Sequence, residues 1–189
     1  MNSPIILASN SPRRKQLLEK SDLSFKVIPS NVYEDFDIKL PAKAFVEYYA
    51  EQKALDIANI YRDHYVIGAD TIVVLDKLIL GKPKDRDDSY NMLKSLSGKT
   101  HMVYTGVSIL HKNYGISKTF HEITEVTFNT LCNRDILYYI DTYNPFDKAG
   151  SYGIQDWFSV CIKKINGCFY NVMGLPLSSF YKHFNKLIK

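Results

Sequence analysis

The chain has 189 residues, of which 46% are hydrophobic and 23% are charged, with a formal net charge of +4 at pH 7. This size and composition suit one globular domain with an ample core, or two closely joined lobes, and exclude a disordered chain. The positive charge is modest and dispersed. It leaves an anionic small ligand open but does not favour nucleic-acid binding, which needs a concentrated basic track.

The N-terminus lacks the pattern of a secretory signal. Its continuous apolar run covers only residues 5–8, and no segment approaches the roughly 20 apolar residues of a membrane span. We therefore expect a cytoplasmic protein with no membrane contact. Cys132, Cys161 and Cys168 form no CxxC pair, so the sequence indicates neither a disulfide framework nor a zinc site.

Hydrophobic spacing predicts strands and helices in alternation along the first half of the chain. The expected strands cover Pro4–Ser9, Ser24–Pro29 and residues 65–75, and the expected helices cover Pro12–Lys20, Pro41–Tyr61 and Arg86–Leu96. The third strand is apolar almost throughout, as in a strand covered on both faces. Its apolar run is interrupted at Gly68-Ala69-Asp70, and we expect Asp70 near the carboxyl end of the strand.

The second half of the chain predicts antiparallel strands and two further helices. Two alternating segments, 100–112 and 117–129, flank Asn113-Tyr114-Gly115, a hairpin signal. We expect next a helix over Asn133–Tyr143, a glycine-containing loop over 145–157, two strands around Asn166-Gly167, and a last amphipathic helix carrying Leu177, Phe180, Tyr181, Phe184 and Leu187. The pattern as a whole predicts an α/β fold with a mixed sheet.

The helix after the first strand places cations where they are unfavourable. Ser11 suits the N-cap and Pro12 the first helical position. Arg13 and Arg14 then fall in the first turn, where each cation is unfavourable by about 0.3–1 kcal/mol because a helix N-terminus is itself positive. Either the guanidinium groups point into water, or they and the exposed backbone N–H groups form a cradle for phosphate.

Two further charged residues lie in apolar surroundings. Lys53 falls on the apolar stripe of the second predicted helix, so its ammonium group either extends to water or meets an anion. Asp70 interrupts a buried strand, with the Thr71 hydroxyl beside it. We favour a ligand site there over a hydrogen-bonded bend, because α/β sheets bind ligands at the ends of their strands.

Lys82 and Glu34 are the remaining candidates from chemistry alone. Lys82 follows Gly81 in a turn, but the proline after it and the missing upstream glycine exclude a P-loop, and a solvated loop lysine is the alternative. Glu34 lies in a polar loop, either solvated or joining Asp70 around a divalent cation, since Mg²⁺ favours one or two carboxylates plus phosphate oxygens.

Four groups of motifs together resemble one protein family. They are "LASNSPRRKQLL", "AEQKA", "VIGADTIVVLDKLILGKPKD" with "LSGKTHMVYTGVSIL", and "FDKAGSYGIQ" followed by "INGCFYNVMGLPL". In this order they resemble the Maf family of nucleotide pyrophosphatases, through nearly the whole chain. Departures such as "KQLLEK" in the first helix fall outside the motif positions.

The resemblance implies a fold, a reaction and an assembly. It implies one Maf-like (ITPase-like) domain over residues 1–189, with an elongated mixed sheet flanked by helices and two lobes around a central cleft. It further implies hydrolysis of a nucleoside triphosphate to the monophosphate and pyrophosphate, a divalent metal cofactor (Mg²⁺ or Mn²⁺) and a homodimer.

The resemblance also assigns roles to residues at matching motif positions. Phosphate binding falls on Ser9, Arg13 and Arg14, catalysis on Lys53, Asp70 and Lys82, and the acidic residue of the second loop on Glu34. Asp70 is implied as proton acceptor or metal ligand, with Glu34 as a further substrate or metal ligand.

The motifs also resemble one subgroup within the family. The Asp70-Thr71 pair and the Ile154-Gln155 pair resemble the subgroup that acts on dTTP and UTP, with Arg13, Thr71 and Gln155 implied in specificity. Two alternatives remain at this point. One is a methylated-GTP pyrophosphatase, and the other is a non-catalytic regulator of cell division that binds nucleotide or nucleic acid.

Overall fold

The computed structural model describes residues 3–188. Its strands are β1 (Ile5–Leu7), β2 (Phe25–Val27), β3 (Tyr65–Leu75), β4 (Leu78–Leu80), β5 (Thr100–His111), β6 (Ile116–Phe128) and β7 (Ile162–Asn166). Its α-helices are α1 (Pro12–Glu19), α2 (Ala42–Ala58), α3 (Arg86–Leu96), α4 (Asn133–Tyr143), α5 (Phe169–Met173) and α6 (Leu177–Phe184). Three short 3₁₀ turns, η1 (Pro145–Asp147), η2 (Ala149–Ser151) and η3 (Trp157–Cys161), lie between α4 and β7.

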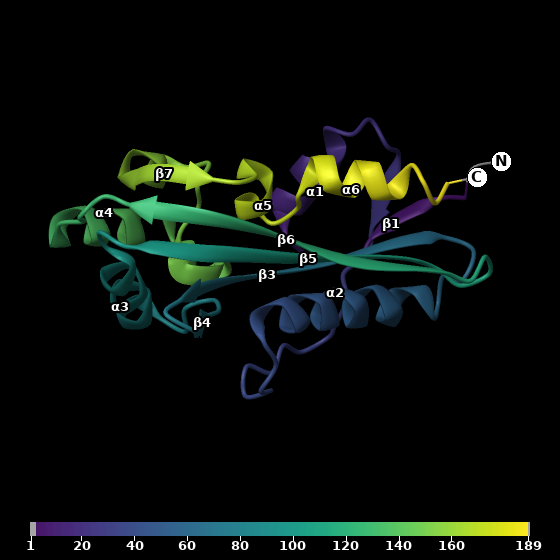
Figure 1. Ribbon diagram of the computed structural model, residues 1–189, viewed down its shortest axis with the longest axis horizontal. Coiled ribbons are helices and arrows are strands. Elements are labelled where there is room, and N and C mark those ends of the chain that lie inside the picture. Colours follow the sequence, from purple (N-terminus) through teal and green to yellow (C-terminus); the bar gives the residue numbers. More distant parts are fainter. Residues whose placement is uncertain (1–2, 189) are drawn as a thin grey trace.

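One mixed sheet of seven strands forms the body of the molecule. Six strands follow the order β2-β1-β3-β5-β6-β7, and β4 pairs with β3. β1 is parallel to β2 and β3, and the remaining pairs are antiparallel. The long β5–β6 hairpin follows the long axis, with α2 on one side of the sheet and α1 and α6 on the other (Figure 1). The predicted α/β architecture, a mixed sheet flanked by helices, is confirmed.

A gap along one edge of β3 positions the cleft described below. β1 pairs with β3 only as far as Leu7 opposite Ile67, and the pairing of β3 with β4 begins only at Val73. Between these pairs β3 is bonded to β5 alone. Successive side chains of a strand point to opposite faces, so the side chains of Asp70 and Thr71 leave opposite faces of the sheet beside the same gap.

The expected position of Asp70 at the end of a strand is wrong. Asp70 lies in the middle of β3 and pairs with Gly106 in an unbroken antiparallel register. The strand continues because β5 supplies partners as far as Val74. The opening for a ligand therefore comes from a missing neighbour on the other edge, and not from the end of the strand.

Two glycines allow α2 to pack closely on the sheet. A Cβ atom at Gly68 would lie 2.2 Å from the Ala50 carbonyl oxygen, and one at Gly106 would lie 2.2 Å from the Val46 carbonyl oxygen. No side chain fits at these two positions, so the helix backbone approaches β3 and β5 directly. Lys53 lies on this close face of α2 and is thereby brought to Asp70.

Most predicted elements are confirmed to within three residues at either end, and Gly115 turns the hairpin at a φ of 64°.

The second strand predicted after Asn166-Gly167 is wrong, since that segment forms the short helix α5. Gly167, at a φ of 131°, turns the chain away from β7. Asn171 then donates to the Val103 carbonyl at 3.1 Å and to the Thr124 hydroxyl at 3.0 Å. Its tertiary contacts, with Gly174 as a left-handed cap, favour a helical turn over pairing.

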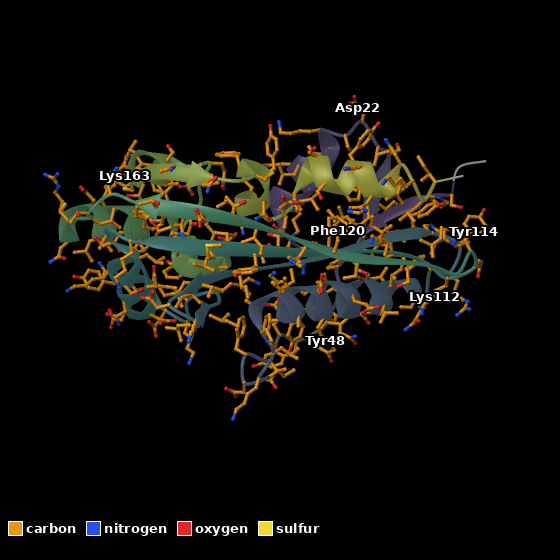
Figure 2. The ribbon with its side chains drawn as sticks, in the orientation of Figure 1. Asp22, Tyr48, Lys112, Tyr114, Phe120 and Lys163 are labelled. Carbon is orange, nitrogen blue, oxygen red and sulfur yellow. The ribbon has the colours of Figure 1, made fainter. Side chains whose placement is uncertain are left out.

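Buried side chains gather at the two ends of the sheet. One core joins α3, α4, η3, the ends of β3 and β6 and the start of β5, and another joins α1, α6, β1, the starts of β3 and β6 and the end of β5. Figure 2 shows Tyr114 at the tip of the β5–β6 hairpin and Tyr48 on the outer side of α2. Within residues 3–188, no helix combines the length and apolar character needed to cross a membrane.

Candidate active site

One cleft of about 310 Å³ opens beside the gap on β3. It brings together residues from opposite ends of the sequence. All nine residues singled out from the sequence line it: Ser9, Arg13, Arg14, Glu34, Lys53, Asp70, Thr71, Lys82 and Gln155.

The N-terminus of α1 forms the cationic wall of the cleft. Ser11 caps the helix by accepting a hydrogen bond from the Arg14 backbone N–H at 3.4 Å, and Pro12 starts it. Arg13 donates to the Asp147 carboxylate and, at 3.1 Å, to the Asp147 carbonyl oxygen. Neither arginine therefore extends freely into water, and the unfavourable first-turn charges are directed into the cleft.

Arg14 is held by three oxygen atoms. Its Nε donates to the Gly174 carbonyl at 2.9 Å, and its two terminal nitrogens donate to Ser9 Oγ at 3.3 Å and Thr71 Oγ1 at 3.0 Å. None of these acceptors is charged. Burial lowers the pKa of Arg14, and the carboxylates of Asp70 and Glu34 act against this shift. The guanidinium thus remains a cation without a directly bound anion, which suits binding of an anionic ligand.

A closed ring of hydrogen bonds fixes the Thr71 hydroxyl. The Thr105 hydroxyl donates to the Asn171 carbonyl at 2.9 Å, so its single proton is already used. In the 3.0 Å contact between the two threonine hydroxyls, Thr71 must therefore be the donor. The Asn171 carbonyl also accepts from the Gly174 backbone N–H at 3.0 Å, which closes the ring back to Arg14. The ring leaves Thr71 with only acceptor capacity toward the cleft.

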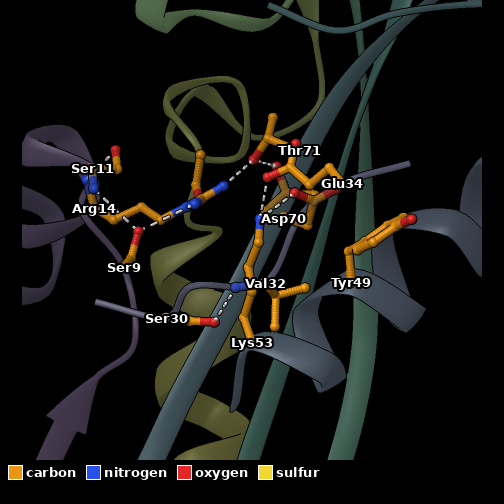
Figure 3. A network of polar contacts seen from close by, with 12 residues as sticks. Ser9, Ser11, Arg14, Ser30, Val32, Glu34, Tyr49, Lys53, Asp70 and Thr71 are labelled. Atoms are coloured by element: carbon orange, nitrogen blue, oxygen red, sulfur yellow. Dashed lines mark hydrogen bonds and ion pairs between the residues drawn. The ribbon is translucent and has the colours of Figure 1, made fainter. Parts of the chain in front are cut away.

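Lys53 joins two carboxylates on the acidic side of the cleft. Its Nζ lies 2.5 Å from Glu34 Oε1 and 2.7 Å from Asp70 Oδ1 (Figure 3). Burial raises the pKa of Asp70, and Lys53 offsets this only in part. Burial acts in the same direction on Glu34, but the nearby cations, Lys53 above all, outweigh it and lower the pKa of Glu34. Lys53 does not extend to water, and Glu34 is not a solvated surface residue.

The acidic pair fits a divalent cation that arrives with a polyphosphate. Asp70 Oδ2 is buried and has no hydrogen-bond partner, and Glu34 lies on the same ammonium group. Within residues 3–188, no three His, Cys, Asp or Glu side chains cluster as a metal site. Two carboxylates completed by phosphate oxygens are nevertheless a common set of Mg²⁺ ligands.

Lys82 reaches the cleft from the loop that follows β4. Gly81 precedes it under the ring of Phe36, where a Cβ atom would lie 2.6 Å from a ring carbon. Phe36 and Glu34 belong to the same loop, so this contact ties the Glu34 loop to the Lys82 loop. The Lys82 side chain is exposed, but it borders the cleft. It is therefore more than a solvated loop lysine.

Sequence reasoning missed two charged residues of the cleft, Asp147 and Lys148. Asp147 accepts from Lys148 Nζ at 2.8 Å as well as from Arg13. Both residues lie in the "FDKAG" part of the quoted motif. An acidic and a basic residue side by side in an expected ligand loop could have indicated that they belong to the site. Gln155, eight residues further on, borders the cleft with an exposed side chain.

The sheet and the cleft define the class of the protein, an α/β protein with a cationic wall facing two carboxylates, suited to a polyphosphate ligand. The comparison of the whole chain with protein families agrees with this class. The model of the family described as Maf-like protein matches residues 4–187. The chain belongs to the Maf family.

Curated relatives share nearly the whole chain. A protein of Thermosipho africanus is 50% identical, over 94% of this chain and 90% of that protein, and it is named dTTP/UTP pyrophosphatase. Proteins with the same name from Desulforamulus reducens (45% identical, 93% of this chain and 92% of that protein) and Bacillus cereus (48% identical, 92% and 90%) match similarly. The structure of the Staphylococcus aureus Ham1 protein matches 66% of this chain and 71% of that one at 18% identity, with a TM-score of 0.45.

Proposed function

We propose that this chain is a nucleoside triphosphate pyrophosphatase that hydrolyses dTTP and UTP to the monophosphate and pyrophosphate. One observation carries the proposal. Cations from α1 and the Lys82 loop share a single cleft with Asp70, a buried carboxylate that has one oxygen without a partner. A carboxylate repels a triphosphate unless a water or a metal requires it, so its place among the cations favours hydrolysis over simple binding. The names of the relatives support the choice of nucleotides.

In the proposed reaction a water molecule attacks the α-phosphorus. The water oxygen forms the new P–O bond, the bond to the β-phosphate oxygen breaks, and pyrophosphate leaves. Asp70 accepts the proton of the water through Oδ2, because its Oδ1 is held by Lys53. Arg13, Arg14 and Lys82 bind the phosphate oxygens and stabilise the leaving pyrophosphate.

Asp70 and Glu34 are the residues that would hold a divalent cation, Mg²⁺ or Mn²⁺. Because Asp70 Oδ1 is held by Lys53, the cation would take Oδ2, as the alternative to direct proton transfer to that oxygen. When bound, the cation supplies Lewis-acid stabilisation of the phosphate charge. Lys53 serves the same two carboxylates, since its ammonium group lies between them and acts against the rise in the pKa that burial causes. Thr71, Arg13 and Gln155 are the proposed specificity residues.

The test is a panel of nucleoside triphosphates with Mg²⁺, with Mn²⁺ and with EDTA. We expect UMP and pyrophosphate from UTP, the equivalent products from dTTP, and loss of turnover in EDTA. Release of UDP and inorganic phosphate would contradict attack at the α-phosphorus. Faster turnover of 7-methyl-GTP would instead favour the methylated-purine reading, and tight nucleotide binding without product would favour the regulator.

The family resemblance also supports a homodimer as the assembly of this single Maf-like unit. Sedimentation velocity distinguishes the dimer from the monomer. A species with twice the chain mass at micromolar concentration is the expected result, and a single species with the mass of one chain would contradict it.

A further inference from the structure

The loop that carries Gln155 combines a fixed backbone with one free side chain. Gly153 and Ile154 are buried, whereas Gln155 is exposed at the cleft. A Cβ atom at Gly153 would lie 2.4 Å from Asp156 Oδ2, a side-chain oxygen that accepts a hydrogen bond from Tyr139. The residues directly before Gln155 are thus buried, whereas the Gln155 side chain has no hydrogen bond of its own among the described contacts.

Tyr139 on α4 contacts this loop on both sides of Gln155. Its hydroxyl oxygen accepts from the Gly153 backbone N–H at 2.9 Å, and its proton is donated to Asp156 Oδ2 at 3.0 Å. The other oxygen of Asp156 accepts from the Phe158 backbone N–H at 3.0 Å, which starts η3. One buried hydroxyl thus ties together the residue two before Gln155 and the residue directly after it.

Packing alone does not account for this hydroxyl. The Tyr139 ring is fully buried and lies against Phe158, with ring centroids 4.8 Å apart, a contact that phenylalanine would keep. A buried hydroxyl is unfavourable unless its hydrogen bonds are made. Both bonds of Tyr139 go to the loop, and burial, with Asp156 nearby, raises the pKa of its phenol so that the donor proton is kept.

We propose that Tyr139 is a positioning residue for recognition of the nucleobase, acting through the backbone around Gln155. The inference rests on the proposed function, in which Gln155 faces the base. A Gln amide presents both a donor and an acceptor and can reverse them. It selects a base only if the backbone that carries it is fixed, and the Tyr139 hydroxyl fixes that backbone. Tyr139 does not line the cleft, so it acts without touching the nucleotide.

The test compares Tyr139→Phe with a matched control. Tyr65→Phe also removes a buried tyrosine hydroxyl, one that donates to the Leu187 carbonyl at 3.1 Å in the other core. We measure kcat/KM for UTP and for GTP with Mg²⁺ in both variants. Tyr139→Phe is expected to lower the ratio of UTP to GTP by roughly three- to tenfold, the worth of one hydrogen bond, mainly through KM for UTP. Tyr65→Phe is expected to leave the ratio unchanged.

Two outcomes decide the inference. An unchanged ratio in Tyr139→Phe overturns it, whether both values of kcat/KM stay the same or fall equally, since an equal fall indicates only a smaller folded fraction. A falling ratio supports it, provided that Asp156→Asn, which keeps an acceptor oxygen for Tyr139, retains more selectivity than Asp156→Ala.

Binding separates this inference from the proposed function. If the unmodified protein releases no pyrophosphate from any triphosphate, the proposed reaction is wrong. The rise in Tm caused by UTP and by GTP then still reports which base is preferred. Loss of the UTP preference in Tyr139→Phe supports positioning by Tyr139 without turnover, and an unchanged preference contradicts it.

Discussion

Asp70 offers one oxygen to Lys53 and leaves the other free. Its Oδ1 accepts from Lys53 Nζ at 2.7 Å, and its Oδ2 is buried without a hydrogen-bond partner. A buried oxygen left unpaired is unfavourable by about 1–3 kcal/mol. A functional role for Oδ2 therefore explains the arrangement better than a contribution to stability does. The two oxygens can divide the work, one for orientation and one for proton transfer.

Replacing Asp70→Asn tests this division. The amide keeps the shape of the side chain but removes the base and the negative charge. We expect kcat for UTP to fall by roughly 10²–10⁴-fold, the usual contribution of a positioned base. Nucleotide affinity, measured by calorimetry with a non-hydrolysable UTP analogue, should persist or increase because a negative charge beside the phosphates is gone. Retained turnover would contradict the role of Asp70 as proton acceptor.

Replacing Lys53 and replacing Lys82 are predicted to affect the stability of the protein differently but its activity similarly. Lys53 is buried between two carboxylates, whereas Lys82 is exposed. Lys53→Met leaves Glu34 and Asp70 uncompensated, so it should lower the free energy of unfolding by about 3–5 kcal/mol. Lys82→Ala should leave stability unchanged within roughly 0.5 kcal/mol. Both should lower kcat/KM for UTP by roughly 10²-fold. Lys82→Ala removes an electrostatic contact to the reacting phosphates, and Lys53→Met releases the two carboxylates that Lys53 holds.

Urea unfolding and initial rates measured on the same preparations check this pair. Equal destabilisation by the two substitutions would mean that the Glu34–Lys53–Asp70 contacts are not a buried ion triad. Full activity of both variants would contradict a role for either lysine in the reaction.

The sequence was sufficient to predict the long elements and many of the residues that line the cleft, although not Asp147 and Lys148. β3, β5, β6 and α4 have strong periodic patterns, which depend little on distant contacts. The cations of α1 and Lys53 were individually badly placed for a stable fold. Such local conflicts are expected where function opposes stability, and the structure brings them into one cleft.

What the sequence could not predict depends on contacts across the chain. Local pattern suggested a strand after Gly167, whereas the buried amide of Asn171 bonds to β5 and β6 and favours a helical turn. The gap that exposes the middle of β3 exists because β1 stops at Leu7, a fact of pairing that no local spacing reveals. The contact between Arg13 and Asp147 spans 134 positions and was missed for the same reason.

Asp147 is predicted to oppose nucleotide binding. It pairs with Arg13 and Lys148 at the rim of the cleft, so a triphosphate that takes Arg13 must first displace it. Asp147→Asn should therefore lower KM for UTP by roughly two- to fivefold, in line with 0.2–1 kcal/mol for an exposed ion pair. The gain should shrink at high salt because exposed charges are screened.

Asp141→Asn is the matched control for Asp147→Asn. Asp141 forms an exposed pair with Arg86, at 2.7 Å and 2.9 Å, outside the cleft. The Asp141→Asn substitution removes the same charge as Asp147→Asn. An equal decrease in KM for UTP in both variants would therefore mean that net charge alone causes the effect, and not competition for Arg13. An unchanged KM in Asp147→Asn would show that the ion pair does not compete with substrate.

His101 makes the stability of the folded protein depend on pH. It is buried on β5, and its Nε2 lies 2.8 Å from the Tyr152 hydroxyl, while its Nδ1 has no partner. Burial lowers the pKa of His101 from 6.5 to about 4. The folded protein therefore keeps this imidazole neutral under conditions where the unfolded chain protonates it.

This difference predicts acid destabilisation that His101→Gln should relieve. Between pH 6.5 and about 4 the unfolded state binds the extra proton, so the free energy of unfolding falls as the pH is lowered through this window. The contribution of His101 at pH 4.5, relative to pH 7, is a loss of about 2–3 kcal/mol. Glutamine keeps a polar atom near Tyr152 without titrating, so the stability of His101→Gln should decline less over the same range. Urea unfolding of both proteins at pH 7 and pH 4.5 measures the difference, and identical declines would show that His101 does not stay neutral in the folded core.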